Sequence, residues 1–287
     1  MSGNFAWSRA ALAGFAVLRR EPGVLVIWGL VGLVFGLADQ VIAVNAEIFR
    51  ITRSGSFVAP LIGSLRLVVG AVAMAIFSAA VYRAVLRPDG ETRARMRFGA
   101  DEIRLTWFWL LQGLLLVIVT ILIGLPVFLI ADRASQLDNP YTTIAAAVGL
   151  GGGLIVWGVL LVRLSLAAPM VVAQGRWSVR DAWRSTRGRA WKIAGVYVPL
   201  LIASALFFSL WTTLCDLAAY AMHVKAPVHA SYKGVALADL FTSTQLFFTA
   251  LDTLVGAAAA AMLYAPAAVI YRDLKGLTPD DQASVFD

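Results

Sequence analysis

The chain has 287 residues, of which 60% are hydrophobic and 14% are charged, and its formal net charge is +7. Soluble domains are about a quarter charged, so this composition excludes a sizeable soluble domain and predicts one membrane-embedded unit over residues 1–287. No nucleic-acid-binding motif accompanies the positive charge, and we expect no nucleic-acid partner. Cys215 is the only cysteine, which excludes an intrachain disulfide.

The N-terminal residues 4–20 mix aromatic and leucine side chains with alanines and end in two arginines before Pro22. This pattern predicts an interfacial helix that the proline stops. A signal peptide is the alternative, with the triplet V-N-A at 44–46 as a candidate cleavage site. The apolar run after Pro22 is about 22 residues, which is long enough to span a bilayer.

Six long apolar segments predict transmembrane helices, and the fold class is therefore an all-α, polytopic membrane bundle with additional interfacial amphipathic helices. The expected spans are 23–44, 58–82, 106–130, 142–165, 193–215 and 240–265. Pro126 is expected to kink the third span, and Pro266 to end or kink the sixth.

The lysines and arginines are distributed unevenly between the two sides of these spans. Seventeen of the 24 lie on the side of the termini, five lie on the other side, and the remaining two, Arg66 and Arg163, lie within spans. Because short cytoplasmic loops carry an excess of Lys and Arg, we expect both termini to be cytoplasmic.

The segment 178–188 joins the fourth and fifth spans and predicts a short amphipathic helix. Ser178 is expected to be its N-cap and Gly188 its stop. Its basic face is expected to contact lipid headgroups, with anionic lipids as partners, through three arginines at i, i+4 and i+7: Arg180, Arg184 and Arg187. The other face carries Val179, Ala182, Trp183 and Thr186.

Small residues form smooth faces on several spans. Gly32 with Gly36, and Gly149 with Gly153, form two Gly-x-x-x-Gly motifs, and Gly256 precedes a run of alanines. Such faces allow close helix packing within one chain or self-association into a homo-oligomer, and the pattern leaves both open.

Motifs that carry catalysis are missing from the sequence: it has no H-E-x-x-H, G-x-S-x-G or phosphate-binding loop motif, and no cysteine cluster. We therefore expect no enzymatic activity, no catalytic residues and no cofactor. His223 and His229 lie in a polar loop with too few further ligands for a metal site, so we expect both to be solvated.

Three ionisable residues fall inside spans: Asp39, Arg66 and Asp252. Each is costly in a bilayer, so partners or water are expected. Counted from the outer ends of the spans, they lie about 7, 12 and 18 Å deep respectively. We expect Arg66 to pair with Asp252, which is too deep to reach water by itself, and we keep Asp39 as the competing partner.

Four short motifs together resemble a known group of proteins: R-x-S-L-A-A-P at 163–169, the following W-S-V-R-D-A-W-R-S-T-R-G-R-A-W, F-G-A-D-E-I-R-L before the third span, and the closing Y-R-D-L-K. They are similar to a group of uncharacterised proteobacterial six-span inner-membrane proteins. That group resembles the membrane domain attached to some glycerophosphodiester phosphodiesterases. The resemblance implies an all-helical protein of the bacterial inner (plasma) membrane. It does not imply an active site.

Two functions are compatible with this sequence. The first is a non-catalytic inner-membrane protein that acts as a scaffold, lipid-associated protein or assembly factor. The second is a small transporter or channel that uses the buried charges Arg66 and Asp252.

Overall fold

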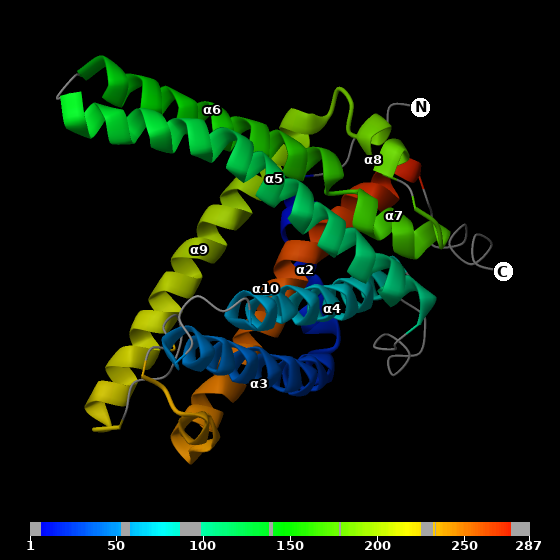
Figure 1. The fold of residues 1–287 in the computed structure, drawn as a ribbon. Helices are drawn as coiled ribbons and strands as arrows, with labels where there is room; N and C mark the ends of the chain where they lie inside the picture. Colours follow the sequence, from blue (N-terminus) through cyan, green and yellow to red (C-terminus); the bar gives the residue numbers. More distant parts are fainter. Residues whose placement is uncertain are drawn as a thin grey trace.

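The computed structural model describes residues 7–52, 58–86, 99–137, 140–177, 179–224, 232 and 234–276. All secondary structure in these ranges is helical, which confirms the all-α fold. Six helices are long and apolar enough to cross a membrane (Figure 1), and the protein is a multi-pass membrane protein. They correspond to α3 (Pro22–Thr52), α4 (Val58–Leu86), α5 (Ala100–Leu137), α6 (Pro140–Leu164), α9 (Ala190–Ala221) and α10 (Ser243–Lys275), and the span that begins in α6 continues to Gln174.

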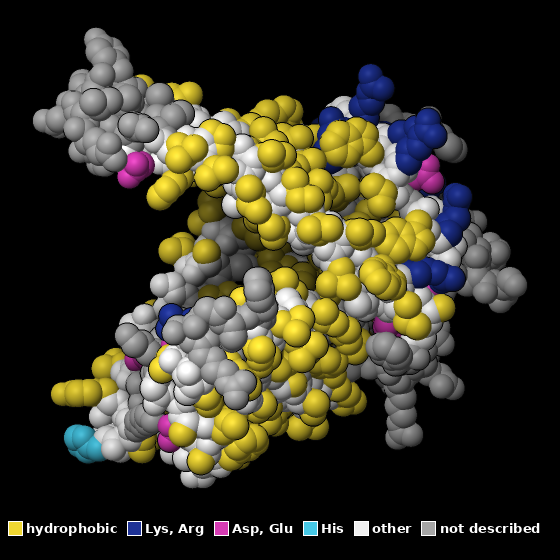
Figure 2. Space-filling model, viewed as in Figure 1, with side chains coloured by type: hydrophobic (Ala, Val, Ile, Leu, Met, Phe, Trp, Pro, Cys, Tyr) yellow, Lys and Arg dark blue, Asp and Glu magenta, His cyan; other side chains and the backbone are white. Residues whose placement is uncertain are grey.

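Short helices lie between the long ones. Four of them gather near the C-terminal ends of α4 and α10: α1 (Trp7–Ala11), α2 (Ala13–Arg20), α7 (Ala167–Gln174) and α8 (Val179–Ser185). Lys and Arg side chains gather there as well (Figure 2), and we call this part of the molecule the basic end. At the opposite end a 3₁₀ helix, η2 (Leu237–Phe241), leads into α10.

The long helices continue past the expected ends of the spans. Helix α3 runs to Thr52 rather than to residue 44, and α5 covers Ala100–Leu137 rather than 106–130. Helix α10 begins at Ser243 and continues through Pro266 to Lys275, so the proline does not end it. Hydropathy marks the hydrocarbon-crossing part of a helix, whereas backbone hydrogen bonds extend the helix beyond that part.

Helices α3, α4 and α10 form the centre of the molecule. Alanines line the faces along which they meet, and Ala75 and Ala79 of α4 and Ala261 and Ala265 of α10 are fully buried. Small side chains let the helix backbones approach closely, which is how membrane helices gain packing energy. Helix α7 completes this core at the basic end, because every residue from Ala167 to Ala173 is buried.

Helices α5 and α6 form a hairpin that extends away from α3 and α4, while α9 diverges in another direction (Figure 1). The face in Figure 2 is hollowed between this hairpin and the part of the molecule below it. Large apolar side chains cover the hairpin, and Leu122, Phe128 and Ile155 are each more than 60% exposed. Such a surface suits contact with lipid acyl chains.

Both Gly-x-x-x-Gly motifs make contacts within the chain. A Cβ at Gly149 would lie 2.6 Å from Cγ2 of Val127 on α5, and a Cβ at Gly32 would lie 3.2 Å from Cβ of Thr253 on α10. These glycines therefore allow close packing of α6 on α5 and of α3 on α10. The homo-oligomer stays a prediction, and these two faces are occupied by the chain's own helices.

The N-terminal segment forms two helices rather than the single helix expected over 4–20. Helices α1 and α2 are separated at Leu12, and residues 4–6 lie outside the described ranges. Gly14 packs directly on the backbone of α10 at Met262, where a side chain would clash. Leu12 and Phe15 are 59% and 53% exposed. Helix α2 is thus anchored on the bundle and also presents apolar side chains outward.

Candidate functional site

A cavity of about 380 Å³ lies between α3, α4 and α10, in the half of the bundle away from the basic end. Its polar lining comes from Asp39 and Gln40 of α3, Thr249, Asp252 and Thr253 of α10, and Tyr232 of the preceding loop. Its apolar lining includes Phe35, Val69 and Phe77. Gly70 and Gly256 also line it, and a Cβ at either position would meet no atom within 4 Å. The space therefore exists partly because these helices carry glycine here.

Arg66 of α4 binds Asp39 beside this cavity through both carboxylate oxygens. Its Nε lies 2.8 Å from Oδ1 and its Nη2 lies 2.7 Å from Oδ2. This fork arrangement is the strongest form of carboxylate recognition by arginine. The side chains of Arg66 and Asp39 are 40% and 35% exposed, so the pair borders the space outside the chain.

The expected partner of Arg66 is thereby corrected from Asp252 to Asp39. Depth along a helix is only one coordinate of a side chain, because rotation about the helix axis decides which neighbour it faces. Asp39 also lies 13 residues before the end of α3, about 20 Å along the axis, because the helix continues beyond the expected span.

Asp252 receives a hydrogen bond from a tryptophan on another helix. Nε1 of Trp211 on α9 donates to its Oδ1 over 2.7 Å. The indole N–H is a neutral donor, whereas the sequence analysis predicts a charged partner for Asp252. This bond ties α9 to α10, beside a small cluster formed by Cys215, Ala219 and Phe248.

Hydrogen-bonding side chains extend the polar lining along α10. Gln40 and Gln245 each donate from Nε2 to Oγ1 of Thr249 over 3.3 Å. The Oε1 atom of Gln40 is buried and accepts no hydrogen bond from the described residues. A buried amide oxygen without a donor is unfavourable, so this acceptor suits water or a ligand in the cavity.

Tyr232 covers the cavity from the loop before η2. Cζ of Arg66 lies 5.6 Å from the centre of its ring, within the range of a cation–π contact. Burial raises the pKa of the Tyr232 hydroxyl above its ordinary value, and Asp39 raises it further while Arg66 lowers it. The hydroxyl is therefore neutral at ordinary pH.

Aromatic side chains fill the bundle between the cavity and the basic end. The rings of Tyr82 and Tyr264 meet edge to face, with their centres 6.1 Å apart, and Trp109 lies 5.8 Å from Tyr264. Nε1 of Trp109 donates to Ser78 over 3.3 Å. Tyr82 is 2% exposed and lies five residues beyond Phe77 of the cavity wall, so this aromatic layer lies between the cavity and the basic end.

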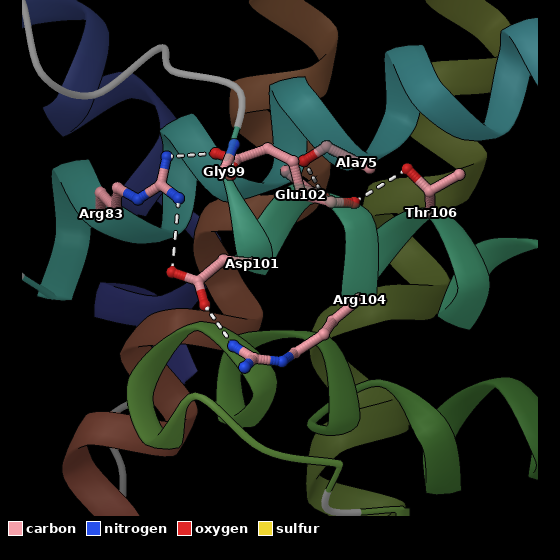
Figure 3. A network of polar contacts seen from close by, with 8 residues as sticks. Ala75, Arg83, Gly99, Asp101, Glu102, Arg104 and Thr106 are labelled. Carbon is pink, nitrogen blue, oxygen red and sulfur yellow. Dashed lines mark hydrogen bonds and ion pairs between the residues drawn. The ribbon is translucent and has the colours of Figure 1, made fainter.

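A buried ionic network at the basic end was not anticipated from the sequence (Figure 3). Nη1 of Arg83 on α4 lies 2.5 Å from Oε1 of Glu102 on α5, and these side chains are 5% and 1% exposed. Asp101 lies 3.5 Å from Nη2 of Arg83 and 3.1 Å from Nη1 of Arg104. Arg83 thereby fixes the start of α5 to the end of α4.

The sequence carried one signal for this network. Gly99 and Glu102 have the spacing of an N-cap residue and the third helical residue, and the Gly99 N–H donates to Oε2 of Glu102 over 2.9 Å. An acidic residue in the first turn is also favoured by the helix dipole. Both effects hold Glu102 in place to receive Arg83.

Helix α8 matches most of the expected amphipathic helix 178–188. It covers Val179–Ser185, with Arg180 and Arg184 exposed on its basic side, and Arg187 is exposed in the turn that follows the helix. Gly188 has the positive φ of 76° that its role as a stop requires, and Ser178 lies outside the described ranges.

The other face of α8 is divided. Ala182 and Thr186 are buried, whereas Val179 and Trp183 are 40% and 44% exposed. Cζ of Arg163, at the end of α6, lies 5.4 Å from the centre of the Trp183 ring, and Thr186 lies within 3.5 Å of its Nη1. Arg163 therefore holds α8 against the end of α6.

No group of three metal-ligating side chains occurs in the ranges that the structure describes. His223 is exposed at the end of α9, as expected of a solvated residue, and His229 lies outside these ranges. Comparisons with family models, curated proteins and solved structures found no match to this chain. The fold and the cavity define a multi-pass membrane protein with a polar site inside its helical bundle.

Proposed function

We propose that the protein binds a small, hydrogen-bond-donating cation, such as an organic ammonium or guanidinium ion, in the cavity between α3, α4 and α10. One observation carries this proposal: the lining presents two carboxylates, Asp39 and Asp252, within a membrane-embedded cavity of about 380 Å³. Ionisable residues inside a membrane are costly, and they mark binding sites or pathways by default. The proposal develops the transporter or channel function that is compatible with the sequence, and it concerns only the binding of the ligand.

The chemistry of the lining supports a ligand that donates hydrogen bonds. Carboxylates accept hydrogen bonds only, and the buried Oε1 of Gln40 is a further acceptor. The guanidinium nearest the cavity, Arg66, already directs two nitrogens to Asp39. The volume lies in the range of small-molecule sites, and Phe35 and Phe77 supply ring faces for a cation.

Access to the cavity favours the side away from the basic end. The partly exposed pair Arg66 and Asp39 borders it there, whereas the buried aromatic layer around Tyr82 and Tyr264 lies between the cavity and the basic end. Transport would require this layer to open, whereas binding requires no change of the structure. An assay of cation uptake into proteoliposomes would therefore test transport, whereas the proposal concerns binding.

The experiment measures thermal stability of the purified protein in detergent with butylammonium, guanidinium, butanol and butyrate as probes. A cation at ten times its Kd adds about 1.4 kcal/mol, or a Tm increase of roughly 3 °C. Gly256→Leu should abolish this increase, because the new side chain occupies free space in the cavity. Gly158→Leu on α6 is the matched control, since it also meets free space and lies outside the cavity lining.

The proposal fails if neither cation raises the Tm more than butanol does, or if Gly256→Leu responds like the unchanged protein. Asp252→Asn provides a second variant, because it keeps the shape of the cavity and removes one charge. It should reduce the effect of the cations and leave that of butanol unchanged.

The arginines of α8 favour a second candidate function, a lipid-associated scaffold or assembly factor. Arg180 and Arg184 of α8, and Arg187 in the turn after it, are all exposed, and the bundle holds this helix at the basic end. Clusters of basic side chains on an amphipathic helix attract anionic lipids. The two functions use opposite ends of the molecule and do not exclude each other.

A further inference from the structure

We infer that a second cavity, at the basic end, binds the phosphate group of a phosphate ester. This cavity has a volume of about 240 Å³ and lies between α1, α2 and the last turns of α4 and α10. It shares no residue with the cation cavity, and the inference goes beyond the proposed function and does not depend on it. Three guanidinium groups line it: those of Arg9, Arg20 and Arg272.

The charges around the cavity favour an anion. Glu21 also lines it and offsets one of the three positive charges. Asp273 lies 3.7 Å from Nε of Arg272 and partly offsets a second positive charge. Arg9 is exposed and forms no ion pair within the described ranges, so its charge remains for a ligand. Guanidinium groups bind phosphate through paired, charge-assisted hydrogen bonds, which makes a phosphate oxygen the fitting partner.

The arginines come from separate elements, but the packing of α2 fixes their relative positions. Gly14 contacts the backbone of α10 at Met262, so α2 cannot move away from α10 without losing this contact. Arg9 on α1 precedes Gly14 in the chain, Arg20 ends α2, and Arg272 belongs to the last turn of α10. A site assembled before the ligand arrives avoids the cost of ordering long side chains from several segments.

Apolar side chains surround the arginines of this cavity. The floor of the cavity is apolar, formed by Ala13, Ala16, Val17, Ala84, Val85 and Val269. Leu12 and Phe15 point their apolar side chains outward from the same helix pair. A phospholipid could place its phosphate among the arginines and its acyl chains beside these residues. Free phosphate has the same chemistry at the phosphorus group, so the experiment separates the two sources.

The test uses the purified full chain in detergent and measures the change in Tm with three probes: dihexanoyl phosphatidylglycerol, dihexanoyl phosphatidylcholine and inorganic phosphate. Arg9→Gln and Arg272→Gln should each weaken the apparent affinity for the phosphatidylglycerol about tenfold, which is the effect of losing one charge-assisted hydrogen bond. Arg19→Gln is the matched control, because Arg19 is an exposed arginine of α2 outside the cavity lining. The arginines of α8 stay in all variants, so their contribution cancels.

A response to phosphatidylglycerol alone assigns the site to a lipid headgroup, and an equal response to inorganic phosphate assigns it to a free phosphate compound. Either result supports the inference when Arg9→Gln reduces it and Arg19→Gln does not. An equal response to phosphatidylcholine supports it on the same condition, because phosphatidylcholine carries the same phosphodiester group. Absence of a response to all three probes overturns the inference. The same conclusion follows if Arg9→Gln binds as tightly as the unchanged protein.

Discussion

Arg66 and Asp39 form a two-point ion pair between neighbouring helices, with nitrogen–oxygen distances of 2.8 and 2.7 Å. The pair joins α4 to α3 at the edge of the polar cavity and holds the Tyr232 ring above the guanidinium. It neutralises two costly charges at once. Asp252, in contrast, is held by the indole of Trp211, so the two carboxylates of the cavity have different first partners.

Variants of this pair should show energetic coupling. Asp39→Asn and Arg66→Gln should each destabilise the protein, and the double variant should lose less than the sum, because the second change no longer leaves a charge alone. We expect a coupling of about 1 kcal/mol, since both side chains are at least a third exposed and are partly screened. Unfolding in detergent, followed by circular dichroism, measures the four stabilities.

The matched comparison combines Arg66→Gln with Asp252→Asn. The losses from these two variants should add within about 0.5 kcal/mol, as expected for residues without a shared contact. Coupling in this second cycle and additivity in the first would show that Arg66 and Asp252 meet instead.

The buried pair Arg83 and Glu102 should be far more sensitive. Glu102→Gln removes the nearer of the two carboxylates that contact the buried guanidinium of Arg83 and should cost roughly 3–5 kcal/mol. The double variant Arg83→Met with Glu102→Gln should recover much of this loss, because no uncompensated charge remains. Arg104→Gln is the control: its side chain is 36% exposed, and it should cost less than about 1 kcal/mol. A small effect of Glu102→Gln in the same unfolding measurement would contradict the network.

Association with anionic lipid should depend on α8. Replacing Arg180, Arg184 and Arg187 with Gln should lower the anionic phospholipid that purifies with the protein, because each basic residue near the surface contributes about 1 kcal/mol. Phosphorus analysis and mass spectrometry of the extracted lipids measure this change. Arg50→Gln, at the other end of the bundle, should leave the lipid content unchanged. Equal lipid content in all three proteins would remove α8 as a lipid contact.

The orientation in the membrane can be tested with fused alkaline phosphatase, which is active only outside the cytoplasm. Seventeen of the 24 basic residues lie on the side of the termini, so a fusion after Asp287 should be inactive and a fusion after His223 active. Quantitative immunoblots of both fusions control for expression. Activity after Asp287 together with silence after His223 would reverse the orientation.

The sequence by itself determined the class of this protein. Runs of more than about 20 apolar residues cannot remain in water, and a helix satisfies its own backbone hydrogen bonds in lipid, so six spans follow from local composition. The arginine face of α8 and the stop at Gly188 were equally local, because they depend on helical spacing and on one backbone angle. The ends of the long helices were less certain, since hydropathy does not report where hydrogen bonding stops.

Only the tertiary structure decided which side chains meet. The choice of Asp39 over Asp252 as partner of Arg66 depends on the rotation of α3, α4 and α10 about their axes, which depth along each helix does not specify. The contact of Gly14 with α10 likewise depends on how α2 folds back. The cavity between α3, α4 and α10 also arises from packing. Gly32 lets α3 approach α10 closely, whereas Gly256 leaves free space beside it. Such relationships join residues as distant in the chain as Gly14 and Met262, 248 positions apart, and no local pattern encodes them.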